Sequence, residues 1–190
     1  MTDDAARPYK LGSLSPSLDP MEHRYDGVWD IEDAKGTERL VVAPAAGHIP
    51  LVAELMGELP EPFGILYILV VPRGGHEPAR YQSPHPTDRA ETLGFLNEYR
   101  EYFERDGRHH LWVMSLPASS TLVYDNHNVI YAYGPLERFQ SVLERHGVRR
   151  GDVRFPVPHT HQYNSEYDAL EDQVMRHWPW KPFPLQAGDS

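Results

Sequence analysis

Apolar residues along this chain gather in short runs of strand length, separated by segments rich in proline and glycine. The longest run covers residues 65–71 and consists mainly of β-branched, aromatic and leucine side chains, which are typical of a buried strand. Pro156 interrupts the last apolar segment and predicts that it lies at a sheet edge. The other predicted strands cover residues 27–31, 39–43, 110–116, 122–124, 129–133 and 153–157. Residues 125–128 separate two of them and predict a hairpin loop.

Other segments repeat apolar residues at the spacing of an α-helix. The clearest covers residues 88–105, where apolar side chains recur about every third position. Ser165 followed by Asp168 predicts a short capping box at the start of the last helix. The further predicted helices cover residues 50–59, 135–146 and 165–177.

This order of elements favours a single-domain α/β or α+β protein. We expect a mixed β-sheet of about five to seven strands, flanked by about four helices. The strands at 40–43, 65–71 and 111–116 are joined by helices, and we expect them to be parallel neighbours.

Three segments differ in composition and suggest the domain organisation. Residues 1–20 contain several prolines and little periodicity, and we interpret them as an irregular N-terminal arm. Residues 21–177 form the α/β domain. Residues 178–190 alternate proline with aromatic side chains and form a tail that either packs on its own domain or joins two copies as a homodimer.

Composition narrows the class of protein further. The chain has no cysteine, which excludes disulfides and thiolate chemistry, and a cytoplasmic location is our default expectation. No apolar run approaches the roughly 20 residues of a membrane helix, so we expect no membrane partner. The formal net charge of −10 disfavours nucleic acid and is compatible with a basic protein partner.

Candidate site residues follow from the expected parallel strands, because the carboxyl ends of such strands share one edge where ligands bind. His48 follows the first of these strands, and Arg73 and His76 follow the second. Since His109 and His110 precede their strand, we expect them at the opposite end, on the surface.

The segment around His159 and His161 carries the strongest chemical signal. Two histidines spaced two apart project to the same side of an extended segment, and imidazole is the commonest metal ligand. Glu166 follows five residues after His161 and completes a potential ligand set for a divalent metal. We therefore take His159 and His161 as candidate metal ligands, with His48, Arg73, His76 and Glu166 as candidate catalytic residues.

Nucleotide cofactors find no support, because the chain contains neither G-x-G-x-x-G nor G-x-x-x-x-G-K-[ST]. A serine nucleophile in a G-x-S-x-G elbow is also absent.

Two functions lead, beside a homo-oligomeric scaffold held by the aromatic tail, and the sequence does not decide whether the protein is an enzyme. The first is an acidic protein-interaction module, of the inhibitor or immunity type, that covers a basic partner. The alternative is a small metal-assisted hydrolase that uses His159 and His161.

Overall fold

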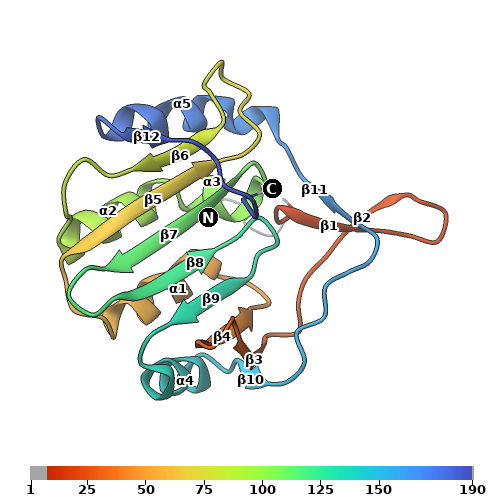
Figure 1. Ribbon diagram of the computed structural model, residues 1–190. Coiled ribbons are helices and arrows are strands. Elements are labelled where there is room, and N and C mark those ends of the chain that lie inside the picture. Colours follow the sequence, from red (N-terminus) through yellow and green to blue (C-terminus); the bar gives the residue numbers. More distant parts are fainter. Residues whose placement is uncertain (1–7, 190) are drawn as a thin grey trace, which may run out of the picture.

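A nine-stranded mixed β-sheet forms the centre of the protein in the computed structural model, which describes residues 8–189 (Figure 1). Its strands follow the order β10-β3-β4-β9-β8-β7-β5-β6-β12, and within it only the short β10–β3 pair is parallel. The strands of this sheet are β3 (Val28–Asp33), β4 (Glu38–Ala43), β5 (Phe63–Leu69), β6 (Ala79–Gln82), β7 (His109–Ser115), β8 (Ser120–Tyr124), β9 (Ile130–Tyr133), β10 (Arg149–Arg150) and β12 (Lys181–Phe183).

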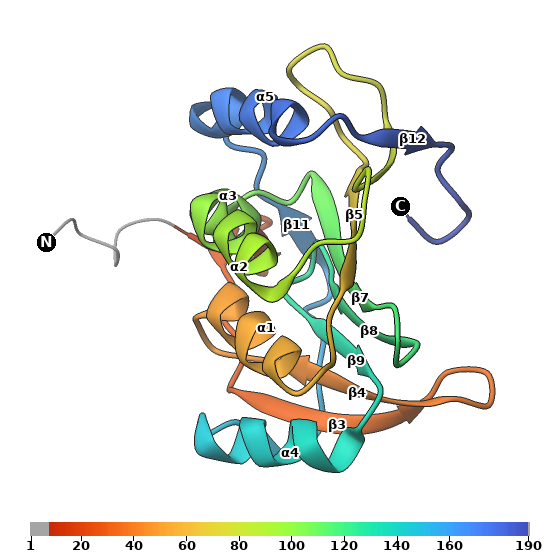
Figure 2. The same cartoon turned by 90° about the vertical axis from the view of Figure 1, so that its left-hand side faces the viewer.

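The helices all lie on one side of this sheet (Figure 2). Asp88 begins α2 as expected, since its side chain accepts a hydrogen bond of 2.8 Å from the backbone N–H of Glu91. The helical segments are α1 (His48–Gly57), α2 (Arg89–Glu98), α3 (Arg100–Arg105), α4 (Leu136–Arg145), α5 (Asp168–His177) and a 3₁₀ turn, η1 (Ser165–Tyr167).

Side chains along the central strands alternate between the helix-covered face and the open face. On β7, Leu111 and Val113 are buried under the helices, whereas His110 and Trp112 point to the other side and are only partly buried. The same alternation continues on β8 and β9. This pattern is typical of an antiparallel sheet with one packed face, and it leaves the other face available for a site.

A second, three-stranded sheet covers one end of the open face. It consists of β1 (Leu11–Leu14), β2 (Pro20–Glu22) and β11 (His159–His161), in the order β11-β1-β2. Leu11 packs with Tyr25, Val41 and Val129 in a small core of their own. The β4 strand is therefore buried on both faces from Leu40 to Ala43.

A buried arginine fastens α5 to the rest of the fold. The side chain of Arg108 is fully buried and donates to Asp106 at 2.7 Å and to Glu171 of α5 at 2.6 Å. The loop after β5 reaches the same helix, because the Arg73 backbone N–H donates to Glu171. Charged contacts thus supplement the apolar stripe of α5.

The α+β class is confirmed, but the number and direction of the strands differ from the prediction. The large sheet has nine strands instead of five to seven, and the described residues contain five α-helices instead of four. The expected parallel arrangement is wrong. The β5 strand pairs antiparallel with β7, and β4 pairs antiparallel with β3 and β9.

Several local expectations are also corrected. No strand forms at 153–157, where Pro156 and Pro158 remove backbone donors; the strand begins at His159 instead. Within the expected irregular arm, the described part contains β1, and residues 1–7 lie outside the described range. Ser165 caps no helix, because α5 begins three residues later without a side-chain cap.

The tail packs partly on its own domain. Trp178 is buried in the main core and Trp180 packs against it, while β12 adds an edge strand beside β6. The homodimer contact through this tail stays a prediction. No helix among residues 8–189 is both long and apolar enough to cross a membrane.

Candidate functional site

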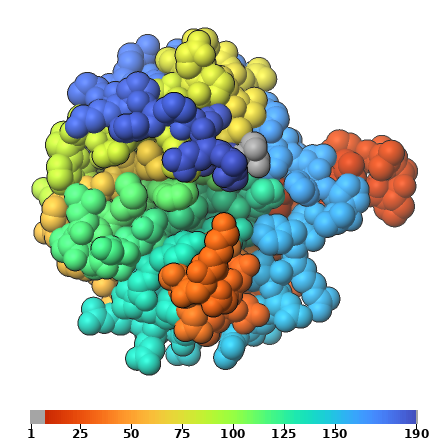
Figure 3. Space-filling model, in the orientation of Figure 1, coloured from red at the N-terminus to blue at the C-terminus, as the bar shows by residue number. Residues whose placement is uncertain are grey.

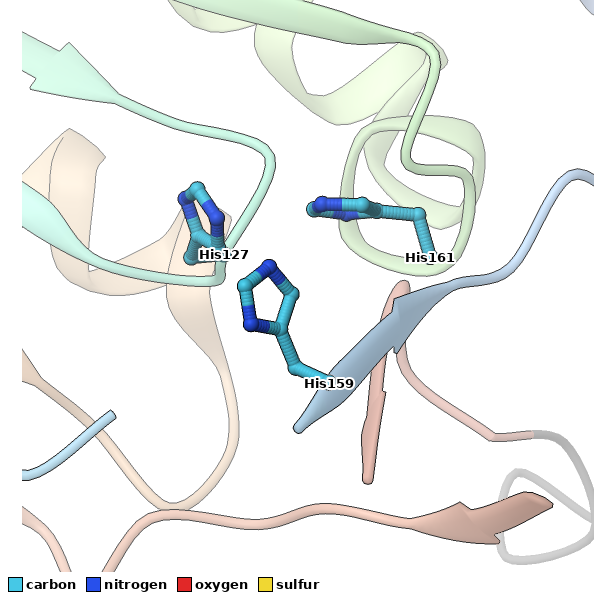
Figure 4. A group of neighbouring side chains, drawn as sticks. All are labelled: His127, His159 and His161. Atoms are coloured by element: carbon cyan, nitrogen blue, oxygen red, sulfur yellow. The ribbon is translucent and has the colours of Figure 1, made fainter. Parts of the chain in front are cut away.

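Three histidines from two distant segments converge beside the open face of the sheet. His127 lies in the turn between β8 and β9, and His159 and His161 lie on β11. Each imidazole offers one nitrogen such that the three atoms all lie within 4.8 Å of one another. Figure 4 shows the three rings pointing toward a common space between the two segments.

The turn that carries His127 is held by a buried carboxylate. Asp125 accepts hydrogen bonds of 2.9 Å from the backbone N–H groups of His127 and Val129, which closes the hairpin. Its second oxygen accepts from Nδ1 of His127 at 3.1 Å. The position and orientation of this imidazole are therefore set by a single side chain.

His161 is oriented in a similar way by a backbone carbonyl. Its Nδ1 donates to the carbonyl oxygen of Asn126 at 3.2 Å, so the same turn contacts both rings. The strand can approach this closely because residue 107 is glycine: a Cβ there would lie 3.0 Å from Cβ of His161. The Gly107 N–H also donates to the Gln162 carbonyl at 2.8 Å and fixes the register.

These hydrogen bonds determine which ring nitrogen is free to bind a metal. Because Nδ1 of His127 and of His161 donates a proton to an oxygen, Nε2 of each ring keeps its lone pair. A carboxylate or carbonyl behind a histidine is the usual outer contact of a metal ligand. Zn²⁺ bound at about 2.1 Å requires nitrogens about 3.4 Å apart, so small ring rotations would complete the site.

The electrostatics favour neutral imidazole at His161 and a charged carboxylate at Asp125. Burial, reinforced by repulsion from His127 and His159, lowers the pKa of His161 to about 4. Burial alone would raise the pKa of Asp125, but the His127 contact and the Val129 N–H bring it below its ordinary value. Because metal ligands must be deprotonated, the neutral His161 ring and the charged Asp125 carboxylate favour binding of a cation near neutral pH.

A cavity of about 1000 Å³ on the open face adjoins this cluster and is lined by His127 and His159. Strands β7, β8 and β9 form its floor with side chains such as Trp112, Val123 and Tyr131. Figure 3 shows this face, with the β3–β4 hairpin in orange and the tail in dark blue at its margins. Its volume is that of a typical small-molecule site.

A buried lysine lies on the other side of the hairpin. The Lys10 side chain is fully buried, and its ammonium group lies 3.6 Å from the centre of the Tyr124 ring. Burial lowers the pKa of Lys10 to about 7 despite the nearby carboxylates of Asp125 and Asp106. Near neutral pH the amino group of Lys10 is therefore partly protonated, and it lies behind the turn that holds His127.

The structure brings together only part of the predicted set. His159 and His161 lie side by side, but the carboxylate of Glu166 is not part of the cluster. His48 is buried at the start of α1, with its ring stacked on Tyr124. Arg73 and His76 instead contact α5, through Asp168 at 3.0 Å and Asp172 at 2.7 Å.

Two important residues were missed by reasoning from the sequence. His127 and Asp125 lie in the predicted hairpin loop and are not among the predicted site residues. The prediction for His109 and His110 was wrong, since His109 is fully buried and His110 lies on the floor of the cavity. An Asp-x-His in a tight turn was the available signal for the first pair.

Comparisons with known proteins found no matching family model, no similar curated protein and no similar solved structure.

Proposed function

We propose that the protein is a metal-dependent enzyme of the hydrolase class, with His127, His159 and His161 as ligands of a divalent transition metal. The observation that carries this proposal is the convergence of three imidazoles. In two of them, Nδ1 donates a hydrogen bond to an oxygen. Such outer contacts orient a ring for binding through Nε2.

The ligand set itself favours zinc or a similar ion. Three neutral imidazoles suit Zn²⁺ and leave one coordination position for water or substrate. A metal at such a site lowers the pKa of bound water toward neutrality and polarises a carbonyl or phosphoryl oxygen. Because His127 and His159 line the cavity, that open position would face a ligand bound there.

The residues around the metal site have distinct expected roles. Asp125 holds the ring of His127 and balances the charge of the cation. The apolar and aromatic floor positions the substrate and limits the water that reaches it. The polar groups on this face also include His110, whose pKa is lowered to about 4 by burial, so that its imidazole is neutral near pH 7.

Metal titration of protein purified without a histidine tag tests the proposal. We expect the wild type to bind about one equivalent of Zn²⁺, and the His127→Ala and His161→Ala variants to bind at least about 100-fold more weakly. Asp125→Asn is expected to weaken binding by about 10- to 100-fold. His85→Ala removes an exposed histidine in the loop after β6 and serves as the matched control.

Activity is measured on the same proteins with a panel of chromogenic carboxylic and phosphoric esters. Hydrolysis that requires the metal and is lost in His127→Ala supports the proposed metal-dependent hydrolase activity. Equal zinc affinity in the wild type, His127→Ala and His161→Ala would contradict the metal site.

The protein-interaction module is the second proposal, and one observation favours it. Leu18 and Met21, on or beside the β1–β2 hairpin, expose 70% and 52% of their surface. On a protein of net charge −10, such side chains suit the apolar centre of an interface with a basic protein. A partner retained by the wild type and lost by Leu18→Ser/Met21→Ser is expected in affinity capture; equal recovery by both proteins would refute this use of the hairpin.

A further inference from the structure

The segment that follows β12 forms part of the cavity wall. Ala187, Gly188 and Asp189 are part of the cavity lining. Figure 3 shows the dark blue tail lying across the open face, opposite the orange β3–β4 hairpin. The segment therefore borders the space that a ligand on this face would use.

The contact between this segment and the sheet is an arginine–carboxylate pair. Arg80, on β6, donates from Nε to Asp189 Oδ2 at 2.8 Å and from Nη2 to Oδ1 at 2.7 Å. The guanidinium group also lies over the ring of Trp112, 5.4 Å from its centre, on the floor of the cavity. Both oxygens of one carboxylate are thus matched to a planar donor fork, which is the standard way to bind a carboxylate or phosphate.

Little else attaches the segment to the fold. The β12–β6 ladder ends at Phe183. For residues 184–189, the other hydrogen bonds found in the described chain are internal, between Gln186 and Asp189. Only 4% of the surface of Asp189 is nevertheless exposed. The ion pair with Arg80 therefore holds the Asp189 carboxylate in a largely enclosed anion-binding position. An external anion could bind at the same position.

We propose that Arg80 is the oxyanion-binding subsite of the cavity, and that Asp189 occupies it until a ligand with a carboxylate or phosphate group displaces it. The aromatic floor beside Arg80 selects a ligand with a flat apolar body. This inference names the substrate class of the proposed enzyme and rests on that function for its catalytic meaning; the binding step itself requires no metal.

Calorimetric titration of metal-free protein tests the subsite with three probes of equal ring system: 2-naphthoate, 2-naphthyl phosphate and uncharged 2-naphthylmethanol. Asp189→Asn weakens the internal competitor and is expected to raise the affinity for at least one of the anionic probes by about 10-fold or more. Arg80→Gln is expected to abolish this binding, and Arg80→Lys, which keeps the charge without the fork, to retain a fraction of it. The preferred anionic probe distinguishes a carboxylate ligand from a phosphate ligand.

Asp152→Asn is the matched control, because it removes a carboxylate from an exposed arginine pair. It is expected to bind the probes as the wild type does. Equal affinity for the anionic probes in the wild type, Asp189→Asn and Arg80→Gln would overturn the subsite. An equal gain for 2-naphthylmethanol in Asp189→Asn would also overturn it, since the segment would then act only as a steric cover. If the protein binds the anionic probes but no zinc, the Arg80 subsite stands and the proposed metal-dependent activity is refuted.

Discussion

Replacing Arg108 with alanine is expected to lower the free energy of unfolding by about 3–5 kcal/mol, a large part of the stability of an ordinary domain. The reason is the charge that remains. Asp106 and Glu171 are fully buried and both accept from Arg108, so its removal leaves two carboxylates without their cation. Urea unfolding followed by circular dichroism measures the change.

Two further variants separate the effect of charge from that of packing. Arg108→Met keeps an unbranched apolar side chain and is expected to lose nearly as much stability as the alanine variant. Adding Asp106→Asn and Glu171→Gln to Arg108→Met should recover part of the loss, because the buried charges are then removed together. Arg154→Ala removes an arginine from an exposed pair and should change stability by less than about 0.5 kcal/mol. A similarly small effect of Arg108→Ala would contradict the role of this residue.

Acid is expected to unfold the protein over the range in which its buried histidines would be protonated. Burial, with repulsion from Lys10, lowers the pKa of His48 to about 3. Burial also brings the pKa of His109 well below its ordinary value. Between the unfolded value of about 6.5 and the folded value, the unfolded chain binds more protons than the native one. The stabilisation is therefore complete above pH 6.5 and is lost as the pH falls.

The expected magnitude is several kcal/mol. The slope rises from half of about 1.4 kcal/mol per pH unit at pH 6.5 to its full value below, so His48 alone accounts for a loss of about 2 kcal/mol between pH 6.5 and 4.5. Urea unfolding at several pH values in this range measures the slope. His48→Phe keeps a ring beside Tyr124 without a titrating group and should flatten the slope. His85→Phe, at an exposed position, should leave it unchanged; equal slopes in the wild type and His48→Phe would contradict the prediction.

Local structure was predictable where a few neighbouring residues decide it. Asp88 marked the start of α2, and the Asp125–Asn128 segment was recognised as a hairpin turn. Capping and turn formation depend on hydrogen bonds within four or five residues, which the sequence displays directly. The α+β class followed from the order of such elements.

Strand direction was not predictable, because the strands expected to be parallel carry apolar side chains on the open face as well. Ile68 and Trp112 on these strands line a cavity rather than face open solvent. Their strands therefore lack the clear polar alternation of a half-exposed antiparallel sheet and resembled strands buried on both faces. The expected parallel edge, and the convergence of His48, Arg73 and His76 on it, followed from that error.

By itself, the sequence determined that His159 and His161 share one side of an extended segment, since a strand repeats every two residues. It could not supply His127, which the β8–β9 turn brings to β11 from 32 residues away in the chain. It also could not show that Asp189 reaches Arg80 across the open face. Both contacts depend on the stacking of strands that are distant in sequence, and the free energy that decides this stacking is spread over the whole core. Only the tertiary structure therefore turned a pair of histidines into a three-ligand site beside a cavity.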